Sequence, residues 1–178
     1  MTDLAIDPAT DHDRAIMATQ LGRTMRGVLG IGARCACGAP TVVVTRPRLP
    51  DGTPFPTFYY LTHPAATAAA SRLEADGTMA ALQEQLQDAE TAAAYAAAHA
   101  AYLADREAHG HVEEIAGISA GGMPTRVKCL HALLAHTLAV GPGVNPIGDH
   151  TLELAEWSPE RCVCDPEARG RADDPPAS

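Results

Sequence analysis

The stretch TVVVTRPRLPDGTPFPTFYYL, residues 41–61, decides the fold of this chain. Its first five residues are all β-branched, and Phe58–Leu61 resumes with aromatic and apolar side chains, a composition typical of strands. Between these two runs, residues 46–56 contain several prolines and the pair Asp51-Gly52, which mark a turn. The stretch therefore predicts an antiparallel hairpin, which His63-Pro64 terminates.

The residues before the hairpin add to this sheet. Gly27–Arg34 has apolar side chains interrupted by glycines and predicts a short strand that runs into a tight turn at Cys35–Pro40. Further upstream, residues 11–23 carry apolar side chains at a loose helical spacing, with Asp11 available as the N-cap and Gly22 ending the pattern. A helix is therefore predicted ahead of the sheet.

The residues after the hairpin are rich in helix formers. Residues 65–109 consist largely of Ala, Leu, Glu and Gln and are broken at Asp76-Gly77, which predicts two helices, the second one long. In the second helix, Tyr95, His99 and Tyr102 are spaced i, i+4, i+7 and form one stripe, which we expect to pack on the sheet. The surrounding alanines permit a close approach to another helix or to a second copy in a homodimer.

A third helix is predicted from about Thr125 to Val140, after a glycine-rich loop, and Gly141-Pro142-Gly143 ends it. Asn145-Pro146 predicts a further turn, and residues 151–157 a short helix. The predicted fold class is therefore α+β, with a small antiparallel sheet covered by helices, one of them long and alanine-rich.

The predicted domain organisation is a single domain over residues 1–164. Residues 165–178 are acidic and proline-rich, and they hold too few apolar side chains to offset the entropy lost on ordering. We therefore expect this tail to be disordered.

Composition excludes several functional classes. The chain has 178 residues, a net charge of −9 and 35 alanines, and only 4% of its residues are aromatic. An acidic chain lacks the Lys and Arg excess that neutralises phosphates in a nucleic-acid binder. The sequence has neither an apolar run long enough for a membrane helix nor a signal-peptide start, so we expect a cytoplasmic protein. Its five cysteines then favour metal binding, chemistry or packing over disulfides.

Soft metal ligands are scattered through the chain, and zinc needs four of them in a tetrahedron. Cys35 and Cys37 lie where a predicted strand enters a turn, His63 lies at the end of a hairpin strand, and Cys129 and His131 start a predicted helix. These side chains could converge at one end of the sheet. In a regular helix, however, residues two apart point about 200° from each other, so Cys129 and His131 bind one ion only if the helix starts late. The alternative is that Cys129 and His136 are ordinary core residues.

The loop before the third helix has the composition of an anion site. Gly121 and Gly122 would expose backbone N–H groups at the positive end of the helix, and Arg126 and Lys128 add charge there. The spacing is not that of a P-loop, and a flexible connector with solvated basic residues fits equally well. A nucleophilic thiol at Cys129 is a further alternative, because a helix N-terminus lowers a thiol pKa.

Four motifs are long enough to be specific. They are Arg34-Cys35 with Gly38 and Pro40, DGTPFPT continuing to YLTHP (residues 51–64), SAGGMPTRVKCLH (residues 119–131) and GPGVNPIGD (residues 141–149). Together they resemble the DUF501 family over most of the chain, from residue 21 to about residue 157. The family is bacterial, common in actinobacteria, and has no established biochemical activity. Its genes often lie beside those of a septum-formation initiator protein and an exopolyphosphatase, which links it by association to cell division or polyphosphate metabolism.

One departure from the family pattern indicates a metal ligand. Family members usually have a cysteine where this chain has His63, and a Cys-to-His exchange conserves a zinc ligand. The resemblance thus favours Cys35, His63, Cys129 and His131 as the ligand set, with zinc as the metal and an iron–sulfur cluster as the alternative. Four further ligands rank below these: Cys37 and His136 as reserves, and Cys162 and Cys164 as incidental residues outside the motifs.

Two functional hypotheses follow, and they leave open whether the protein is an enzyme. In the first, the metal is structural and the protein is a binding or adaptor module. In the second, an open metal position activates water for hydrolysis or transfer on a phosphorylated substrate at the Gly121–Lys128 loop, with Asp149 or His136 as acid or base. Four protein ligands favour the first hypothesis, and three ligands plus water favour the second.

Overall fold

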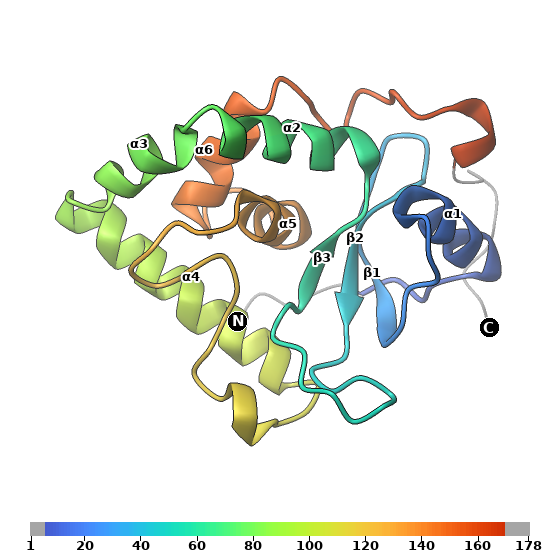
Figure 1. Cartoon of the computed structure of the whole chain (residues 1–178), viewed down its shortest axis with the longest axis horizontal. Coiled ribbons are helices and arrows are strands. Elements are labelled where there is room, and N and C mark those ends of the chain that lie inside the picture. Colours follow the sequence, from blue (N-terminus) through green and yellow to red (C-terminus); the bar gives the residue numbers. More distant parts are fainter. Residues whose placement is uncertain (1–5, 170–178) are drawn as a thin grey trace.

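A computed structural model describes residues 6–169 of the chain. A three-stranded antiparallel sheet lies between one N-terminal helix and a larger group of helices (Figure 1). The fold class is therefore α+β, as the sequence predicts. The elements in chain order are α1 (Asp11–Leu21), β1 (Val28–Arg34), β2 (Pro40–Thr45), β3 (Tyr59–Leu61), α2 (Pro64–Ala75), α3 (Thr78–Gln85), α4 (Ala89–Glu107), η1 (Glu113–Ile115), α5 (Leu130–Val140), α6 (Pro146–Leu154) and η2 (Pro166–Ala168).

The predicted hairpin is formed by β2 and β3, and β1 completes the sheet in the order β1-β2-β3. Every residue of the central strand β2 is buried. Because successive side chains point to opposite faces of a sheet, both faces of β2 must be covered. Val43 packs with Met17 of α1, whereas Val42 and Val44 belong to the main core around α5. The continuous β-branched run of β2 therefore reflects a strand covered on both sides.

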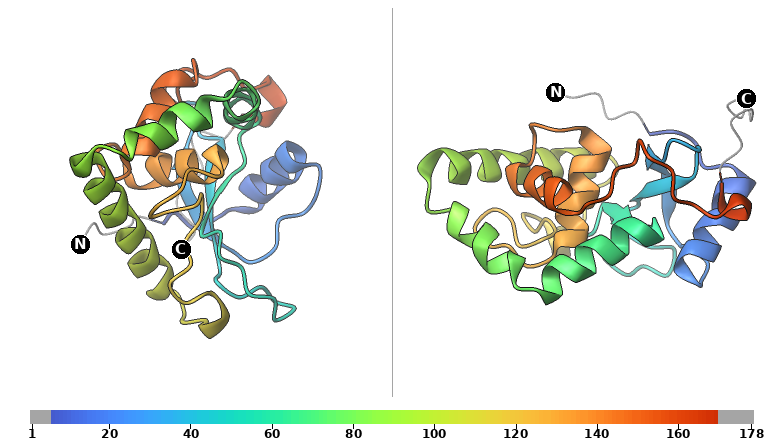
Figure 2. Two further views of the ribbon diagram at one scale, coloured as in Figure 1. Left: turned by 60° about the vertical axis from the view of Figure 1, so that its left-hand side comes forward. Right: turned by 90° about the horizontal axis from the view of Figure 1, so that it is seen from above.

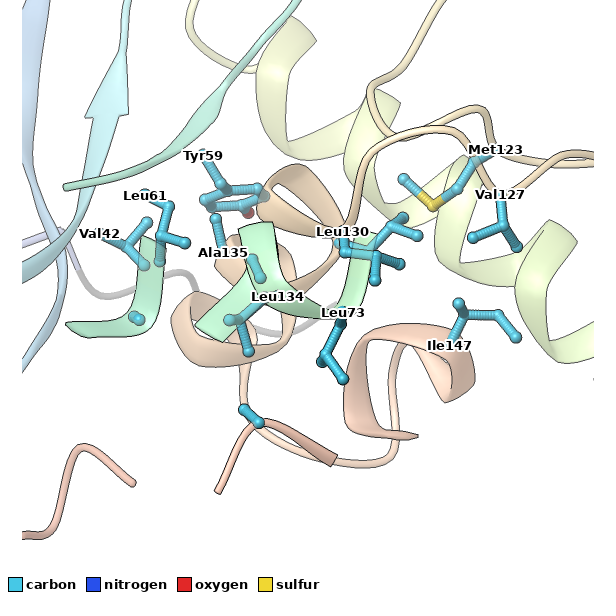
Figure 3. Close-up of a cluster of buried hydrophobic side chains, with 14 of the residues drawn as sticks. Val42, Tyr59, Leu61, Leu73, Met123, Val127, Leu130, Leu134, Ala135 and Ile147 are labelled. Atoms are coloured by element: carbon cyan, nitrogen blue, oxygen red, sulfur yellow. The ribbon is translucent and has the colours of Figure 1, made fainter. Parts of the chain in front are cut away.

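Helix α5 is the centre of the main core (Figure 3). It packs against β3, α2 and α6, and Leu130, Leu133 and Leu134 are fully buried. Helix α6 approaches closely, because a Cβ atom on Gly148 would lie 2.4 Å from the carbonyl oxygen of Leu133. Small side chains thus allow the helices to surround α5 tightly.

The helical region 65–109 contains three helices, so the prediction of two was wrong. The additional break lies between α3 and α4, where Asp88 caps α4 by accepting a hydrogen bond from the Thr91 N–H (2.8 Å). An Asp three residues before a Thr in an alanine-rich run is a capping signal that the sequence interpretation overlooked. The predicted stripe is confirmed in part: Tyr95 and Tyr102 are fully buried, and the backbone N–H of Phe58 donates to the Tyr102 hydroxyl.

Helix α5 begins at Leu130, five residues later than predicted. The preceding loop makes its own hydrogen bonds, since the Arg126 and Lys128 N–H groups donate to the carbonyls of Gly122 and Gly121 (3.0 and 2.8 Å). The α3 residue Gln83 also holds this loop by accepting from the Val127 N–H. These bonds replace the helical ones that residues 125–129 would otherwise make.

Helix α6 begins earlier than predicted, because Asn145-Pro146 is a helix start and not a separate turn. The Asn145 side chain accepts from the Gly148 N–H, and Pro146 occupies the first helical position. Among residues 6–169 no helix is both long and apolar enough to cross a membrane. Residues 165–169 of the predicted tail are placed and contain η2, whereas residues 170–178 lie outside the described residues.

Candidate metal centre

Four cysteines from two distant segments meet beside the sheet. The sulfur atoms of Cys35, Cys37, Cys162 and Cys164, here called the four-cysteine cluster, all lie within 4.8 Å of one another. The Sγ atoms of Cys35 and Cys164 are 3.9 Å apart, far beyond a disulfide bond of about 2.05 Å. Tetrahedral zinc with bonds of about 2.3 Å separates its sulfur ligands by about 3.8 Å. The cluster therefore has a spacing that suits one metal ion.

The first cysteine pair lies in the turn that joins β1 to β2. The turn is closed by the Cys35 N–H donating to the Ala39 carbonyl and by the Gly38 N–H donating to the Cys35 carbonyl, both 2.8 Å. Gly38 has a φ of 85°, a left-handed conformation that favours glycine. This tight turn places two cysteines, separated by Ala36, at the end of the sheet.

Arg34 fixes the turn to α1. Its guanidinium makes a two-pronged ion pair with Asp13 (2.7 and 3.1 Å) and donates to the Gly38 carbonyl (2.9 Å). Burial alone would raise the pKa of Asp13, but hydrogen bonds from Arg34 and Thr10 outweigh it and hold that pKa below its usual value. The Arg34-Cys35 pair with Gly38 is thus a positioning device for the first two cysteines.

The second cysteine pair lies in the segment between α6 and η2, residues 155–165. This segment crosses from α6 over the end of the sheet toward α1 (Figures 1 and 2). The Ala36 N–H donates to the Pro159 carbonyl (2.7 Å), so a backbone hydrogen bond joins the turn to the segment. Cys162 and Cys164 pack against a small apolar cluster formed by Ile16, Cys35 and Ala39.

His63 contacts the four-cysteine cluster from the end of β3. Its Nε2 atom lies 3.1 Å from the Cys164 sulfur, and its ring packs on Trp157 with centroids 5.0 Å apart. The side chain is buried, and burial lowers its pKa. In the described part of the chain, Nδ1 of His63 has no hydrogen-bond partner. His63 is therefore placed to contact a cysteine ligand directly.

Two of the thiols, those of Cys35 and Cys164, favour the protonated state when no cation is bound. Burial raises the pKa of Cys35 and also that of Cys164. A metal ion reverses this preference, because its positive charge stabilises the thiolate and displaces the proton. The alternative is a neutral thiol cluster that serves as apolar packing.

The predicted ligand set is divided between two places. Cys35 and His63 lie at the four-cysteine cluster, whereas Cys129 and His131 lie with Glu74, and the donor atoms of these three are within 4.8 Å of one another. We call Glu74, Cys129 and His131 the helix-start cluster, because two of them flank the first residue of α5. The structure does not gather the four predicted ligands into one group.

Three of the four residues ranked below the predicted ligand set lie in the four-cysteine cluster. Cys37, ranked as a reserve, lies with Cys35, while His136 belongs to neither group within residues 6–169. Cys162 and Cys164, predicted to be incidental, supply half of the four-cysteine cluster. The signal that could have found them is the repeat of one spacing, Cys-X-Cys, at both ends of the chain.

The helix-start cluster is held by several hydrogen bonds. Glu74 Oε1 accepts from the Leu130 N–H (2.7 Å) and pairs with His131 Nδ1 (3.0 Å), and Ser71 Oγ lies 3.1 Å from His131 Nε2. The hydrogen bond with Cys129 is the main reason that the pKa of His131 rises to about 9; burial opposes this rise and Glu74 supports it.

The predicted anion loop has fewer free backbone N–H groups than expected. The N–H groups of Arg126 and Lys128 already donate to glycine carbonyls, and at the start of α5 the Leu130 N–H donates to the chain's own carboxylate, Glu74. The side chains of Arg126 and Lys128 are exposed. An anion role for Gly121, Gly122, Arg126 and Lys128 stays a prediction, and Glu74 would compete with the anion.

A groove of about 630 Å³ opens beside the helix-start cluster. Cys129 and His131 line it together with residues from the end of α1, from β3 and from the start of α2. Most of these residues are apolar, and Tyr60, whose hydroxyl accepts from Arg23, adds a polar group. One of the two clusters thus faces a cavity large enough for a small molecule.

Comparison with known proteins assigns the chain to a family. A family model described as "Protein of unknown function (DUF501)" matches residues 31–153. No curated protein and no solved structure matches the chain. The matched region includes Cys35, Cys37 and the whole helix-start cluster, and it ends before Cys162 and Cys164. Since the model spans more than half of the sequence and carries the motifs noted above, the chain belongs to the DUF501 family.

Proposed function

We propose that the protein binds one zinc ion through Cys35, Cys37, Cys162 and Cys164, and that this ion has a structural role. The observation that carries the proposal is the convergence of four thiols from two distant segments within 4.8 Å. Thiolate is a preferred zinc ligand, and four thiolates form a common structural site.

A structural role follows from the ligand number. Four protein ligands complete a tetrahedral zinc site, whereas catalytic zinc sites keep one position for water or substrate. The ion would tie the β1–β2 turn to residues 155–165, which contain neither an α-helix nor a strand. The apolar residues around the cluster are few, so a metal bond adds support where burial contributes little.

The short sulfur separation favours a single ion over an iron–sulfur cluster. A cluster lies between its cysteine ligands and requires them to stand farther apart than ligands of one ion. The 3.9 Å between Cys35 and Cys164 suits one ion. One iron ion bound by the same thiolates is the remaining alternative, and metal analysis distinguishes it from zinc.

We further propose that the protein is a cytoplasmic binding or adaptor module. A reducing compartment keeps the four thiols available for metal. The acidic composition argues against a nucleic-acid partner, and the alanine-rich surface of α4 suits a second copy of the chain. The association of family genes with cell division and polyphosphate metabolism indicates where a partner should be sought.

The test is metal analysis of the purified full chain under reducing conditions. We expect Cys35→Ser and Cys164→Ser each to lower the zinc content by one equivalent per chain relative to the wild type. Val163→Ser is the matched control, because Val163 lies between Cys162 and Cys164 but is exposed and is not one of the four donors. Equal zinc content in the wild type and in both cluster variants would refute the proposal.

A further inference from the structure

We propose that Glu74, Cys129 and His131 form a second metal site, which takes a divalent transition metal such as zinc and has one coordination position open toward the groove. The inference is independent of the four-cysteine cluster, because the two clusters share no residue. It rests on the donor geometry, on the late start of α5 and on the adjoining groove.

The late start of α5 makes this geometry possible. Cys129 and His131 are two residues apart and would point away from each other in a regular helix. Cys129 instead precedes the helix in an extended conformation (φ −148°, ψ 105°), while His131 lies in the first turn. Their side chains therefore converge, and Glu74 near the end of α2 supplies the third donor.

Hydrogen bonds position the Glu74 carboxylate through only one of its two oxygen atoms. The Leu130 N–H and His131 Nδ1 both contact Oε1 of Glu74, at 2.7 and 3.0 Å. Within the described residues, Oε2 makes no hydrogen bond and is available to a cation. Either Nδ1 or the Ser71-bonded Nε2 of His131 can release its present partner to bind the metal.

The donor set resembles that of catalytic metal sites in number and type. One carboxylate, one thiolate and one imidazole suit zinc, and three protein ligands leave the fourth position for water or a ligand. Cys129 and His131 line the groove of about 630 Å³, so a molecule in the groove could reach that position. The expected ligand class is a small molecule with an apolar body and one metal-binding group.

A purely structural role for these contacts makes a different prediction. Glu74 caps α5 by accepting from the Leu130 N–H, and this alone explains why it lies beside His131. In that case the three residues would stabilise the helix start but would bind no metal. Metal binding by the full chain therefore separates the two explanations.

The experiment is a zinc titration of the metal-free full chain under reducing conditions, with bound metal counted after equilibrium dialysis. We expect two equivalents in the wild type and one in Cys129→Ser and His131→Gln. Serine is a preferred N-cap, so Cys129→Ser supports the start of α5 while it removes the soft ligand. Glu74→Gln keeps an acceptor for the Leu130 N–H, and we expect it to weaken the second equivalent at least tenfold.

Thr67→Ala is the matched control, because Thr67 lines the groove from α2 but is not one of the three donors. We expect it to keep both equivalents. A single equivalent in the wild type that Cys35→Ser abolishes would overturn this inference and leave the four-cysteine proposal standing. Loss of only one of two equivalents in Cys129→Ser, with none lost in Cys35→Ser, would support the inference and refute the other proposal. Loss of the second equivalent in Thr67→Ala as well would show local disruption and overturn the inference.

Discussion

The two clusters differ in how the chain brings their donors together. The four-cysteine cluster is assembled from a turn and from residues 155–165, and a backbone hydrogen bond between Ala36 and Pro159 links these segments. The helix-start cluster is assembled from α2 and the first turn of α5, and hydrogen bonds to Leu130 and Ser71 support it. One cluster depends on holding two loops together, whereas helix packing sets the other.

This difference separates two uses of the same ligand types. Where four thiols surround one point, a metal would be fully coordinated and would act as a cross-link. Where three different donors lie beside a groove, a metal would keep a position for a ligand. With metal in both, the chain would pair a closed site that supports its structure with an open site that faces a cavity.

The largest expected effect comes from removing a ligand of the four-cysteine cluster. Cys164→Ser should lower the free energy of unfolding by more than about 4 kcal/mol, because the metal-binding energy is then lost from the folded state. Hydrogen exchange locates the effect. The Ala36 N–H, which donates to Pro159, should lose protection, while the Leu130 N–H, which donates to Glu74, should keep it. Equal loss at both amides would show that the clusters are not separate structural units.

A second prediction concerns acid stability and tests α5 apart from both clusters. His136 is fully buried between Tyr59 of β3 and Tyr102 of α4, with Nδ1 3.2 Å from the Asn145 amide, and burial lowers its pKa to about 4. In the unfolded chain the imidazole of His136 has its ordinary pKa of 6.5. Between pH 4 and pH 6.5 the unfolded state therefore binds more protons at this residue than the native state does. The contribution of His136 to the free energy of unfolding is thus fully present above about pH 6.5. It falls by about 3 kcal/mol as the pH drops to 4.

Denaturant unfolding of the wild type and of His136→Gln at several pH values measures this contribution. We expect the variant to be less stable at pH 7 and to lose much less stability on acidification. Acid also protonates metal-bound thiolates, and this effect should remain in the variant. His111→Gln, at an exposed histidine, is the control and should keep the wild-type pH dependence. An unchanged slope in His136→Gln would contradict the prediction.

The smallest expected effect is at His63, which lies beside the four-cysteine cluster. His63→Leu removes the nitrogen 3.1 Å from the Cys164 sulfur. We expect zinc affinity to fall about tenfold with unchanged stoichiometry, because residues that contact metal ligands tune the site without completing it. Competition with a chelator measures the affinity. Trp157→Phe keeps a ring against His63 and is the control.

The outcome at His63 also tests the ligand set that the resemblance indicates. Complete loss of one zinc equivalent would show that His63 is a ligand. Unchanged affinity would show that its contact with Cys164 has no effect on the metal.

The sequence was sufficient for the sheet and for the general positions of most helices. The β-branched run of β2 and the prolines after it define the hairpin by local preference alone. The boundaries of α5 and α6 could not be predicted in this way. The start of α5 depends on Glu74, more than fifty residues earlier in the chain, and the start of α6 depends on reading Asn145-Pro146 as a cap and not as a turn.

The candidate site was predicted in its residue types and only partly in its grouping. The closeness of Cys35 and Cys37 to each other follows from the tight turn that contains both residues. Their pairing with Cys162 and Cys164 depends on the path of residues 155–165 over the sheet, which local sequence preferences do not specify. Cys129 and His131 were expected near each other if the helix started late, and the structure confirms that condition.

The hydrogen bond between Ala36 and Pro159 has a consequence for the life of the protein in the cell. With metal bound, residues 158–165 would be held at the sheet both by that bond and by their two cysteines. Ala155 and Trp157 are buried in the main core and would stay in place without metal. We expect the part beyond Trp157 to detach and become accessible to proteases, since it contains neither an α-helix nor a strand to protect its backbone. The abundance of the protein would then follow the zinc supply of the cell, through degradation and without any change in gene expression.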